Sequence, residues 1–330
     1  MRNKILLAPI FQNERFDTEE RRQGLDKLAK LGDLELEPSE LTEDDADGVV
    51  GVIASSALIH PSFYQAAKKL RVISRWGVGY ENTNYEIAAQ HGVFVTIAPE
   101  HMVTVAEYTI AQWMATLKRV YTLNQLSHGG DFSIIRTYEA SGSTLGLYGF
   151  GRIGQAVATR AKPLLGNAGR LLVYDVRSDI KELAAKYGAI AVDDPMVLFR
   201  ESDTVSLHVA GDDVIVNYDC LCAMRPHGSL INPSRGNLVD DQSVNRAIHE
   251  ERLYYYVVDD PVNGPRAIHK NHPRIICTNH NAGITLESAI RLDLRTFGQV
   301  TDAIQGRKPA HILNLNVLDH PRVKAHLKTE

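Results

Sequence analysis

The amino-acid sequence predicts an α/β protein whose parallel sheet is covered by helices on both faces. Short apolar runs alternate with helix-compatible segments along most of the chain, which is the pattern of parallel strands joined by helices. Residues 143–175, STLGLYGFGRIGQAVATRAKPLLGNAGRLLVYD, form one strand–turn–helix–strand unit. A chain of 330 residues is also too long for one ordinary core, so we expect two domains.

The first hundred residues are expected to contain alternating strands and helices. Thr18 and Asn84 are typical N-cap residues, and Pro61 suits the first turn of a helix. Gly32 and Gly92 follow segments of helical spacing and are expected to end them. The expected strands are residues 4–8, 48–53, 71–74 and 93–97, and the expected helices are residues 18–30, 61–69 and 84–91.

Residues 104–121 are predicted to form one long helix. Its apolar side chains cover more than one face, and they are Val105, Ile110, Trp113, Met114, Leu117 and Val120. A helix that is apolar on several sides is expected to be buried on several sides, as at a contact between domains or subunits.

The glycines of the 143–175 unit predict a dinucleotide-binding turn. Gly149 allows a tight turn after the first strand, Gly151 lets a pyrophosphate approach the backbone, and Gly154 lets the helix pack closely on the sheet. The N–H groups of the first helical turn would face the phosphates. Asp175, at the end of the second strand, would bind the adenosine ribose and so favours NAD over NADP, although the neighbouring Arg177 leaves NADP open.

The alternation continues after this unit. The expected helices are residues 180–186, 195–201, a helix before Met224, residues 240–250 and residues 286–305. The expected strands are residues 189–192, 204–208, 229–232, 253–258 and 275–278.

Composition argues against several classes of function. A net charge of −4 gives no reason to expect nucleic acid or an anionic membrane as a partner. Cys220, Cys222 and Cys277 are too few for a disulfide framework and lack the spacing of a zinc site, so no metal is expected. The first residues do not resemble a signal peptide, and no run of eighteen apolar residues occurs. We therefore expect a cytoplasmic protein.

Three further motifs lie at expected strand ends: RWGVGYENTN (75–84), INPSRGNLVDD (231–241) and CTNHNAG (277–283). With the glycine unit, they make residues 50–310 resemble the D-2-hydroxyacid dehydrogenase family, which includes phosphoglycerate, glycerate, D-lactate and formate dehydrogenases and NAD-sensing corepressors. The resemblance implies two doubly wound, Rossmann-like domains with a cleft between them. Residues 1–100, completed by 296–330, would bind the substrate, and residues 101–295 would bind NAD. It also implies a homodimer supported by the helix at 104–121.

The resemblance assigns roles to individual residues. Arg235 would hold the carboxylate of a small 2-keto acid and polarise its keto oxygen, as a planar guanidinium suits a carboxylate. His280 would donate the proton as hydride arrives, and accept it in the reverse direction from the D-2-hydroxy acid. Arg75, Val78 and Gly79 would also bind the substrate. The remaining cofactor-binding residues would be Arg152, Ile153, Val209, Pro233 and Asp259.

The sequence departs from the family where the histidine normally has a glutamate partner, because that position is Gly264. A nearby carboxylate would raise the pKa of a histidine and orient its ring, so we expect slower reduction or an acidic pH optimum, unless Asp260 substitutes. A dinucleotide-binding regulatory or scaffold protein is therefore the alternative function. A formate-dehydrogenase-like enzyme is disfavoured because the glutamine of those enzymes is also absent. Tyr254, Tyr255 and Tyr256 stand where the family has small residues, and they require extra room.

Overall fold

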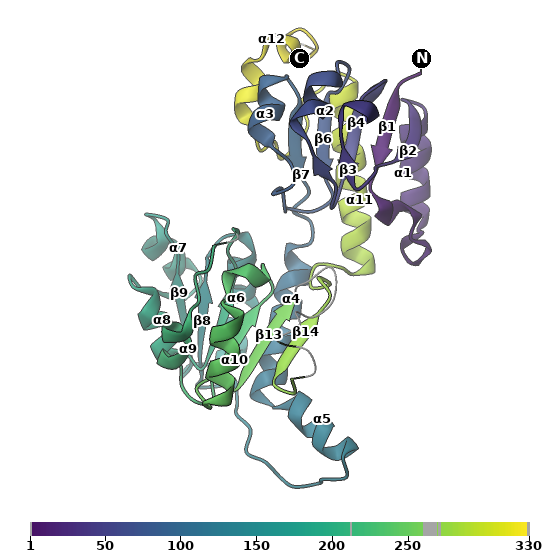
Figure 1. Cartoon of the computed structure of the whole chain (residues 1–330). Helices are drawn as coiled ribbons and strands as arrows, with labels where there is room; N and C mark the ends of the chain where they lie inside the picture. Colours follow the sequence, from purple (N-terminus) through teal and green to yellow (C-terminus); the bar gives the residue numbers. More distant parts are fainter. Residues whose placement is uncertain (1, 212, 260–268, 270–271, 329–330) are drawn as a thin grey trace. The chain divides into compact units, whose positions relative to one another are not determined.

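The computed structural model describes residues 2–211, 213–259, 269 and 272–328. The chain divides into two compact units, Met1–His101 with Ile284–Glu330, and Met102–Gly283 (Figure 1). Residues 284–295, which the sequence analysis placed in the second domain, belong to the first unit. The reason is that α11 (Leu286–Ile304) is one continuous helix, capped by the Thr285 side chain, whose buried face packs in the first unit.

The first unit is built on a five-stranded parallel sheet with strand order β2-β1-β4-β6-β7. Its strands are β1 (Lys4–Leu7), β2 (Asp33–Leu36), β4 (Val49–Ala54), β6 (Val72–Arg75) and β7 (Phe94–Ile97). Its helices are α1 (Glu19–Ala29), α2 (Pro61–Ala66), α3 (Tyr85–Gln90), α11 and α12 (Pro321–Lys324). The short pieces are β3 (Glu40–Leu41), β5 (Leu58–Ile59), and 3₁₀ turns at Pro9–Gln12, Glu14–Phe16, Glu43–Asp45 and Leu315–Asp319. Residues 33–36 were not expected to form a strand.

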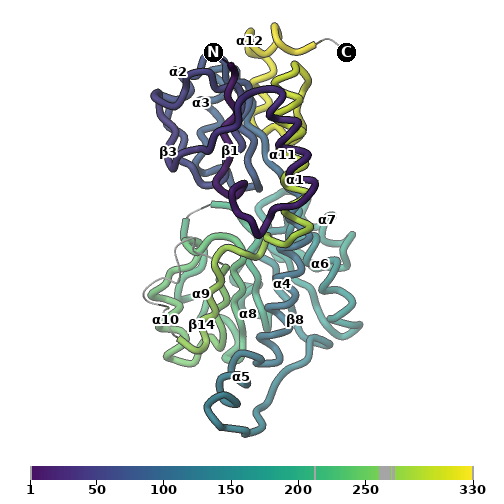
Figure 2. Tube along the Cα trace, turned by 90° about the vertical axis from the view of Figure 1, so that its right-hand side faces the viewer, coloured from purple at the N-terminus to yellow at the C-terminus, as the bar shows by residue number. Residues whose placement is uncertain are grey.

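Two apolar clusters, one on each face of this sheet, form the core of the first unit. Phe63 and Tyr64 of α2 belong to one cluster, and Leu28 of α1 and Phe297 of α11 belong to the other. Helix α11 lies beside α1, so the C-terminal part of the chain completes a unit that the N-terminal part begins (Figure 2). The contact is close, since a Cβ on Gly24 would lie 2.2 Å from the Phe297 ring.

A buried ion pair joins these two helices. Arg21 of α1 donates through Nε and Nη2 to Asp293 of α11, at 2.7 and 3.1 Å, and the two side chains are 2% and 1% exposed. Trp76 donates its indole N–H to the same carboxylate at 2.7 Å. Because Trp76 directly follows β6, this network fixes the start of the 75–84 motif to α11.

The second unit is built on a seven-stranded parallel sheet with strand order β10-β9-β8-β11-β12-β13-β14. Its strands are β8 (Thr144–Tyr148), β9 (Arg170–Tyr174), β10 (Ile190–Ala191), β11 (Thr204–Leu207), β12 (Ser229–Asn232), β13 (Tyr255–Asp259) and β14 (Ile275–Thr278). Its helices are α4 (Met102–Leu117), α5 (Val120–His128), α6 (Arg152–Leu165), α7 (Ile180–Lys186), α8 (Pro195–Glu201), α9 (Tyr218–Ala223) and α10 (Asp241–His249), with a 3₁₀ turn at Gly236–Leu238. The expected doubly wound α/β fold is confirmed in this unit and in the first.

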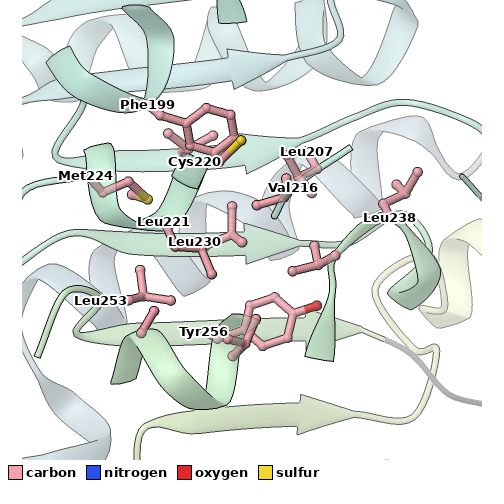
Figure 3. Packing of buried hydrophobic residues seen from close by; sticks show 14 of the residues in the cluster. Phe199, Leu207, Val216, Cys220, Leu221, Met224, Leu230, Leu238, Leu253 and Tyr256 are labelled. Atoms are coloured by element: carbon pink, nitrogen blue, oxygen red, sulfur yellow. The ribbon is translucent and has the colours of Figure 1, made fainter. Parts of the chain in front are cut away.

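Helices cover both faces of the second sheet. The cluster drawn in Figure 3 joins α8, α9 and α10 to one face, with Phe199, Leu221 and Tyr256 among its buried members. On the opposite face, α4, α6 and α7 pack through residues such as Trp113 and Val157. None of the helices in the described part of the chain is long and apolar enough to cross a membrane.

The single helix expected at residues 104–121 is wrong. The structure has two helices, α4 and α5, separated at Arg119, whose φ of 49° is left-handed. The Arg119 guanidinium lies 3.9 Å from the centre of the Tyr254 ring, and the Tyr255 hydroxyl accepts a hydrogen bond from the Thr122 N–H at 3.1 Å. The helix therefore breaks where Tyr254, just before β13, and Tyr255, the first residue of β13, contact it.

Candidate active site

The carboxyl edge of the second sheet contains a topological switch point between β8 and β11. From β8 the chain adds β9 and β10 on one side, and from β11 it adds the remaining strands on the other. Open parallel sheets bind ligands at this point. The glycine turn follows β8 here, and His208 and Val209 follow β11 beside it.

The glycine turn has the backbone geometry that the sequence analysis expected of it. Gly149 has a φ of 96°, and a Cβ there would lie 2.4 Å from the His208 carbonyl oxygen. A Cβ on Gly154 would lie 2.4 Å from the Gly149 oxygen, so α6 packs closely against the turn. A Cβ on Gly151, the N-cap of α6, would meet no atom within 4 Å. The approach to the start of α6 is thus open, which fits a phosphate at the helix N-terminus beside Arg152 and Ile153.

Asp175 follows β9 and holds the glycine turn in place. One carboxylate oxygen accepts the Phe150 N–H at 2.6 Å, and the other accepts the Arg177 N–H at 3.1 Å. A pocket of about 530 Å³ lies beside it, lined by residues 174–178, Ile180, Lys181, Val192 and Asp193. Arg177 is paired with Asp179 through two hydrogen bonds of 2.5 and 2.9 Å. A ribose 2′-phosphate would need a positive charge here, and the carboxylates of Asp175 and Asp179 offset the charge of Arg177. The pocket therefore fits the adenosine part of NAD better than that of NADP.

Arg235 lies in the loop after β12, and Asn232 shapes that loop. The Asn232 amide donates to the Arg235 carbonyl at 2.8 Å, and its side-chain oxygen accepts the Ser234 N–H at 3.1 Å. Ser234 in turn donates its hydroxyl to the Leu207 carbonyl at 2.9 Å, which joins this loop to β11. The Arg235 side chain is partly buried and donates to the Ser234 carbonyl at 3.0 Å. Pro233 lies within the same held loop.

His280 lies in the loop after β14, and Asp259 at the end of β13 holds that loop. One Asp259 oxygen accepts the Thr278 hydroxyl at 2.5 Å and the Asn281 N–H at 2.9 Å, and the other accepts the Ala282 N–H at 2.6 Å. His280, between these contacts, has a left-handed φ of 56°. Asp259 is expected from the sequence to bind the cofactor, and in the structure both of its oxygens accept hydrogen bonds from the histidine loop.

Strand order places Arg235 and His280 near each other on one sheet edge. They follow β12 and β14, which flank β13. Neighbouring strands lie about 4.8 Å apart, so the two loops start roughly 10 Å from each other. At this separation, an arginine and a histidine side chain can both reach one small acid between them.

Three residues expected to bind substrate lie in the first unit, at the carboxyl end of β6. Arg75 is buried, and its guanidinium donates to the Gly79 carbonyl at 2.7 Å and to the Ser55 carbonyl. Val78 and Gly79 lie in the turn that Arg75 closes. Glu37, which follows β2, accepts the Ser55 N–H at 3.1 Å, and burial raises its pKa to about 7. Arg75 therefore shapes the loop that carries Val78 and Gly79.

His208 is a residue that the sequence reasoning missed. Neither of its ring nitrogens has a hydrogen-bond partner within the part of the chain that the structure describes. Burial lowers its pKa to about 3, so its ring is neutral at physiological pH. A histidine that stays neutral at pH 7 is not suited to donate a proton there. The motif SLHVAG was the only available signal, and it does not show that the ring nitrogens are buried.

Gly264 and Asp260, on which the expected loss of the catalytic carboxylate depends, lie outside the described residues. Among the residues that are described, carboxylates pair with His60, His227 and His269.

The chain resembles known proteins over most of its length. A family model described as D-isomer specific 2-hydroxyacid dehydrogenase, NAD binding domain, matches residues 110–282. A D-3-phosphoglycerate dehydrogenase of Methanocaldococcus jannaschii is 28% identical over 303 residues, 87% of this chain and 56% of that protein. A glyoxylate reductase of Korarchaeum cryptofilum is 33% identical over 219 residues, 62% of this chain and 63% of that protein. The chain thus spans only about 56–63% of the length of these two relatives. The apo-structure of D-lactate dehydrogenase from Escherichia coli aligns with a TM-score of 0.76 at 23% identity, over 94% of this chain and 99% of that one.

Proposed function

This chain belongs to the D-isomer specific 2-hydroxyacid dehydrogenase family, and from that premise we propose that it interconverts a small 2-keto acid and its D-2-hydroxy acid with NAD. The observation that carries the proposal is the arrangement of Arg235 and His280. They follow β12 and β14 at the sheet edge that also holds the glycine turn, and Asp259 of the strand between them fixes the histidine loop.

In the proposed reaction the cofactor supplies the hydride, and the residues of the chain bind and protonate the substrate. Arg235 holds the carboxylate of the 2-keto acid by two parallel N–H donors. His280 holds a proton at the keto oxygen and transfers it as that oxygen gains electrons. Gly149, Gly151 and Gly154 leave the start of α6 open to the pyrophosphate, with Arg152 and Ile153 in its first turn.

The remaining assignments complete the proposal. Val209 and Pro233 border the nicotinamide ribose, and Asp259 lies at the nicotinamide side. Arg75, Val78 and Gly79 of the first unit are assigned to substrate binding, and residues 1–101 with 284–330 are the substrate-binding part. A cytoplasmic location is also part of the proposal, since the few cysteines favour no oxidising compartment.

The direct test is NADH oxidation with glyoxylate, hydroxypyruvate and pyruvate. Glyoxylate is included because the K. cryptofilum relative is a glyoxylate reductase. We expect turnover with at least one of the three acids. In Arg235→Gln, kcat/KM should fall by about 10³, since the fork that grips the carboxylate is lost, while NADH affinity is retained. A protein that binds NADH and turns over no 2-keto acid would reject the proposal.

A regulatory or scaffold protein that binds NAD is the second candidate, because Gly264 stands at the family's glutamate position. Gly264→Glu distinguishes the two. In an enzyme, restoring the carboxylate that the family has at this position should raise kcat, because a carboxylate partner orients a catalytic imidazole. The control is Gly264→Gln, which has similar size and no charge. In a scaffold protein, neither variant would create turnover.

We also propose that the protein is a homodimer formed through the segment after α5. Phe132 and Ile134 there are 79% and 101% exposed, which is unusual for large apolar side chains placed close together. Phe132→Ser with Ile134→Ser should halve the mass measured by light scattering. An unchanged mass would place the interface elsewhere.

A further inference from the structure

A chain of hydroxyl groups joins α4 to the histidine loop. The Tyr108 hydroxyl lies 2.7 Å from the Thr278 hydroxyl, which donates to Asp259 at 2.5 Å. Asp259, at the end of β13, is 2% exposed. The contact crosses 170 residues of sequence, and nothing in the glycine motif or the 277–283 motif requires a tyrosine on α4.

The direction of the hydrogen bonds follows from the acceptors. Both Asp259 oxygens accept backbone N–H groups, from Asn281 and Ala282, so the carboxylate acts as an acceptor. Thr278 therefore gives its only hydroxyl proton to Asp259, and Tyr108 must donate to Thr278. Burial raises the pKa of Tyr108, so its phenol keeps the proton that this role needs.

The residue held between these contacts is in an unusual conformation. His280 has a φ of 56°, a left-handed backbone conformation that residues other than glycine adopt uncommonly. Such a conformation persists only where its surroundings determine it. Thr278 precedes His280 by two residues and Asn281 and Ala282 follow it, and all three bind one carboxylate. The position of the imidazole thus depends on how firmly that carboxylate is held.

We propose that Tyr108 is a positioning residue for His280, acting through Thr278 and Asp259. The proposal rests on the proposed function for the role of His280, but its structural part does not. With the Tyr108 hydroxyl in place, the Thr278 hydroxyl has one remaining orientation, toward Asp259, and the loop keeps a single geometry. Without it, Thr278 can rotate and the two N–H contacts of Asp259 weaken.

The structural part is tested by amide hydrogen exchange in Tyr108→Phe, which keeps the ring and removes the hydroxyl. We expect the Asn281 and Ala282 N–H groups to exchange about tenfold faster than in the wild type. The matched control is Tyr121→Phe, whose hydroxyl binds Gln112. Thr278→Val is the second variant, should Tyr108→Phe fail to fold. Unchanged exchange at both amides in Tyr108→Phe or Thr278→Val would overturn the inference.

The functional part is tested by kinetics on the 2-keto acid that is turned over. Tyr108→Phe and Thr278→Val should each lower kcat about tenfold, which equals about 1.4 kcal/mol, with the KM for NADH changed less than twofold. Thr278→Ser, which keeps the hydroxyl, should restore kcat. In a His280→Asn background, Tyr108→Phe should have no further effect, since there is no imidazole left to position. A role limited to packing would lower kcat by the same factor in both backgrounds.

Failure of this inference and failure of the proposed function give different results. If the wild type shows no turnover but Tyr108→Phe speeds hydrogen exchange at the Asn281 and Ala282 amides, the loop contact is supported and the proposed reaction is rejected. If the wild type turns over a 2-keto acid and Tyr108→Phe behaves like Tyr121→Phe in kcat and in exchange, the reaction stands and Tyr108 is not a positioning residue.

Discussion

Gly149 is constrained both by its backbone conformation and by a close neighbour. Comparing alanine substitutions at Gly149 and Gly142 separates the two effects. Its φ of 96° disfavours any side chain, and a Cβ there would also meet the His208 backbone at 2.4 Å. Gly142 has a φ of 80°, yet a Cβ on it would meet nothing within 4 Å. Gly142 therefore measures the cost of the backbone conformation alone.

Gly149→Ala should lower the free energy of unfolding by about 3 kcal/mol or more and weaken NADH binding at least tenfold. The carbonyl of His208 is backbone and cannot move without disturbing the end of β11. Gly142→Ala should cost only about 1 kcal/mol and leave NADH binding unchanged. Urea unfolding and NADH fluorescence titration measure both quantities. Equal losses in the two variants would contradict the close approach at Gly149.

Glu37 should make the stability of the protein depend on pH. Burial raises its pKa from 4.5 to about 7. The folded chain thus holds this proton more tightly than the unfolded chain, so the stabilisation is complete below pH 4.5 and is lost as the pH rises through about 7. The full effect is about 3 kcal/mol.

Glu37→Gln should therefore be more stable than the wild type at pH 8 and of similar stability at pH 4.5, since its amide can still accept the Ser55 N–H. Thermal unfolding at the two pH values measures this. Glu35→Gln, at an exposed position of β2, is the control and should change stability by less than about 1 kcal/mol at either pH. A wild type whose stability does not fall between pH 5 and 8 relative to Glu37→Gln would contradict the raised pKa.

At the scale of residues, the sequence predicts where a residue lies in the fold better than it predicts which residues it contacts. The places of Gly149 and Gly154 follow from backbone geometry, which neighbouring residues determine. Asp175 was expected to bind a ribose, and the structure adds that it binds the Phe150 N–H. The pairing of Tyr108 with Thr278 could not be predicted, because it depends on how α4 packs on the sheet. The substrate and cofactor roles of the site residues remain predictions.

At the scale of elements, α5 begins without a side-chain cap of its own. Its N-cap, Arg119, makes no capping hydrogen bond, and the Tyr255 hydroxyl of β13 accepts the Thr122 N–H instead. The same hydroxyl lies 2.5 Å from the Thr122 hydroxyl. A strand thus supplies the cap of a helix.

Tyr255→Phe should lower the free energy of unfolding by about 1 kcal/mol, the usual cost of a lost cap, and speed amide exchange in the first turn of α5. Tyr254→Phe, which keeps the ring over Arg119, is the control and should cost less than about 0.5 kcal/mol. Faster exchange in both variants, or in neither, would show that the hydroxyl does not cap the helix.

The errors in the expected elements have two physical causes. The helix at 104–121 has no glycine or proline to end it, so only the contacts of Arg119 and Tyr255 reveal the break. Strand β2 was missed because it is an edge strand without a buried run, in which Glu35 and Leu36 are exposed. The central strands, which are buried on both faces, were all predicted, with ends displaced by one or two residues.

At the scale of the whole molecule, the two units should unfold in separate steps. NADH at 100 times its Kd should stabilise the unit that contains the glycine turn by about 2.7 kcal/mol and leave the other transition in place. Asp293→Ala should act on the other transition alone, with a loss of about 3–5 kcal/mol, because it leaves Arg21 buried without its carboxylate. Calorimetry with and without NADH measures this. A single unfolding transition that is shifted both by NADH and by Asp293→Ala would contradict separate unfolding of the two units.

The division of the first unit between the two ends of the chain has a consequence for biosynthesis. A ribosome releases α1 early, with Arg21 and Gly24, but Asp293 and Phe297 of α11, which contact them, emerge only after all of residues 102–283. The nucleotide-binding unit, being continuous, can fold during translation. The face of the first sheet that α1 and α11 share stays partly uncovered until the last turns of α11 leave the exit tunnel, so nascent chains are most exposed to chaperones and to aggregation in that interval.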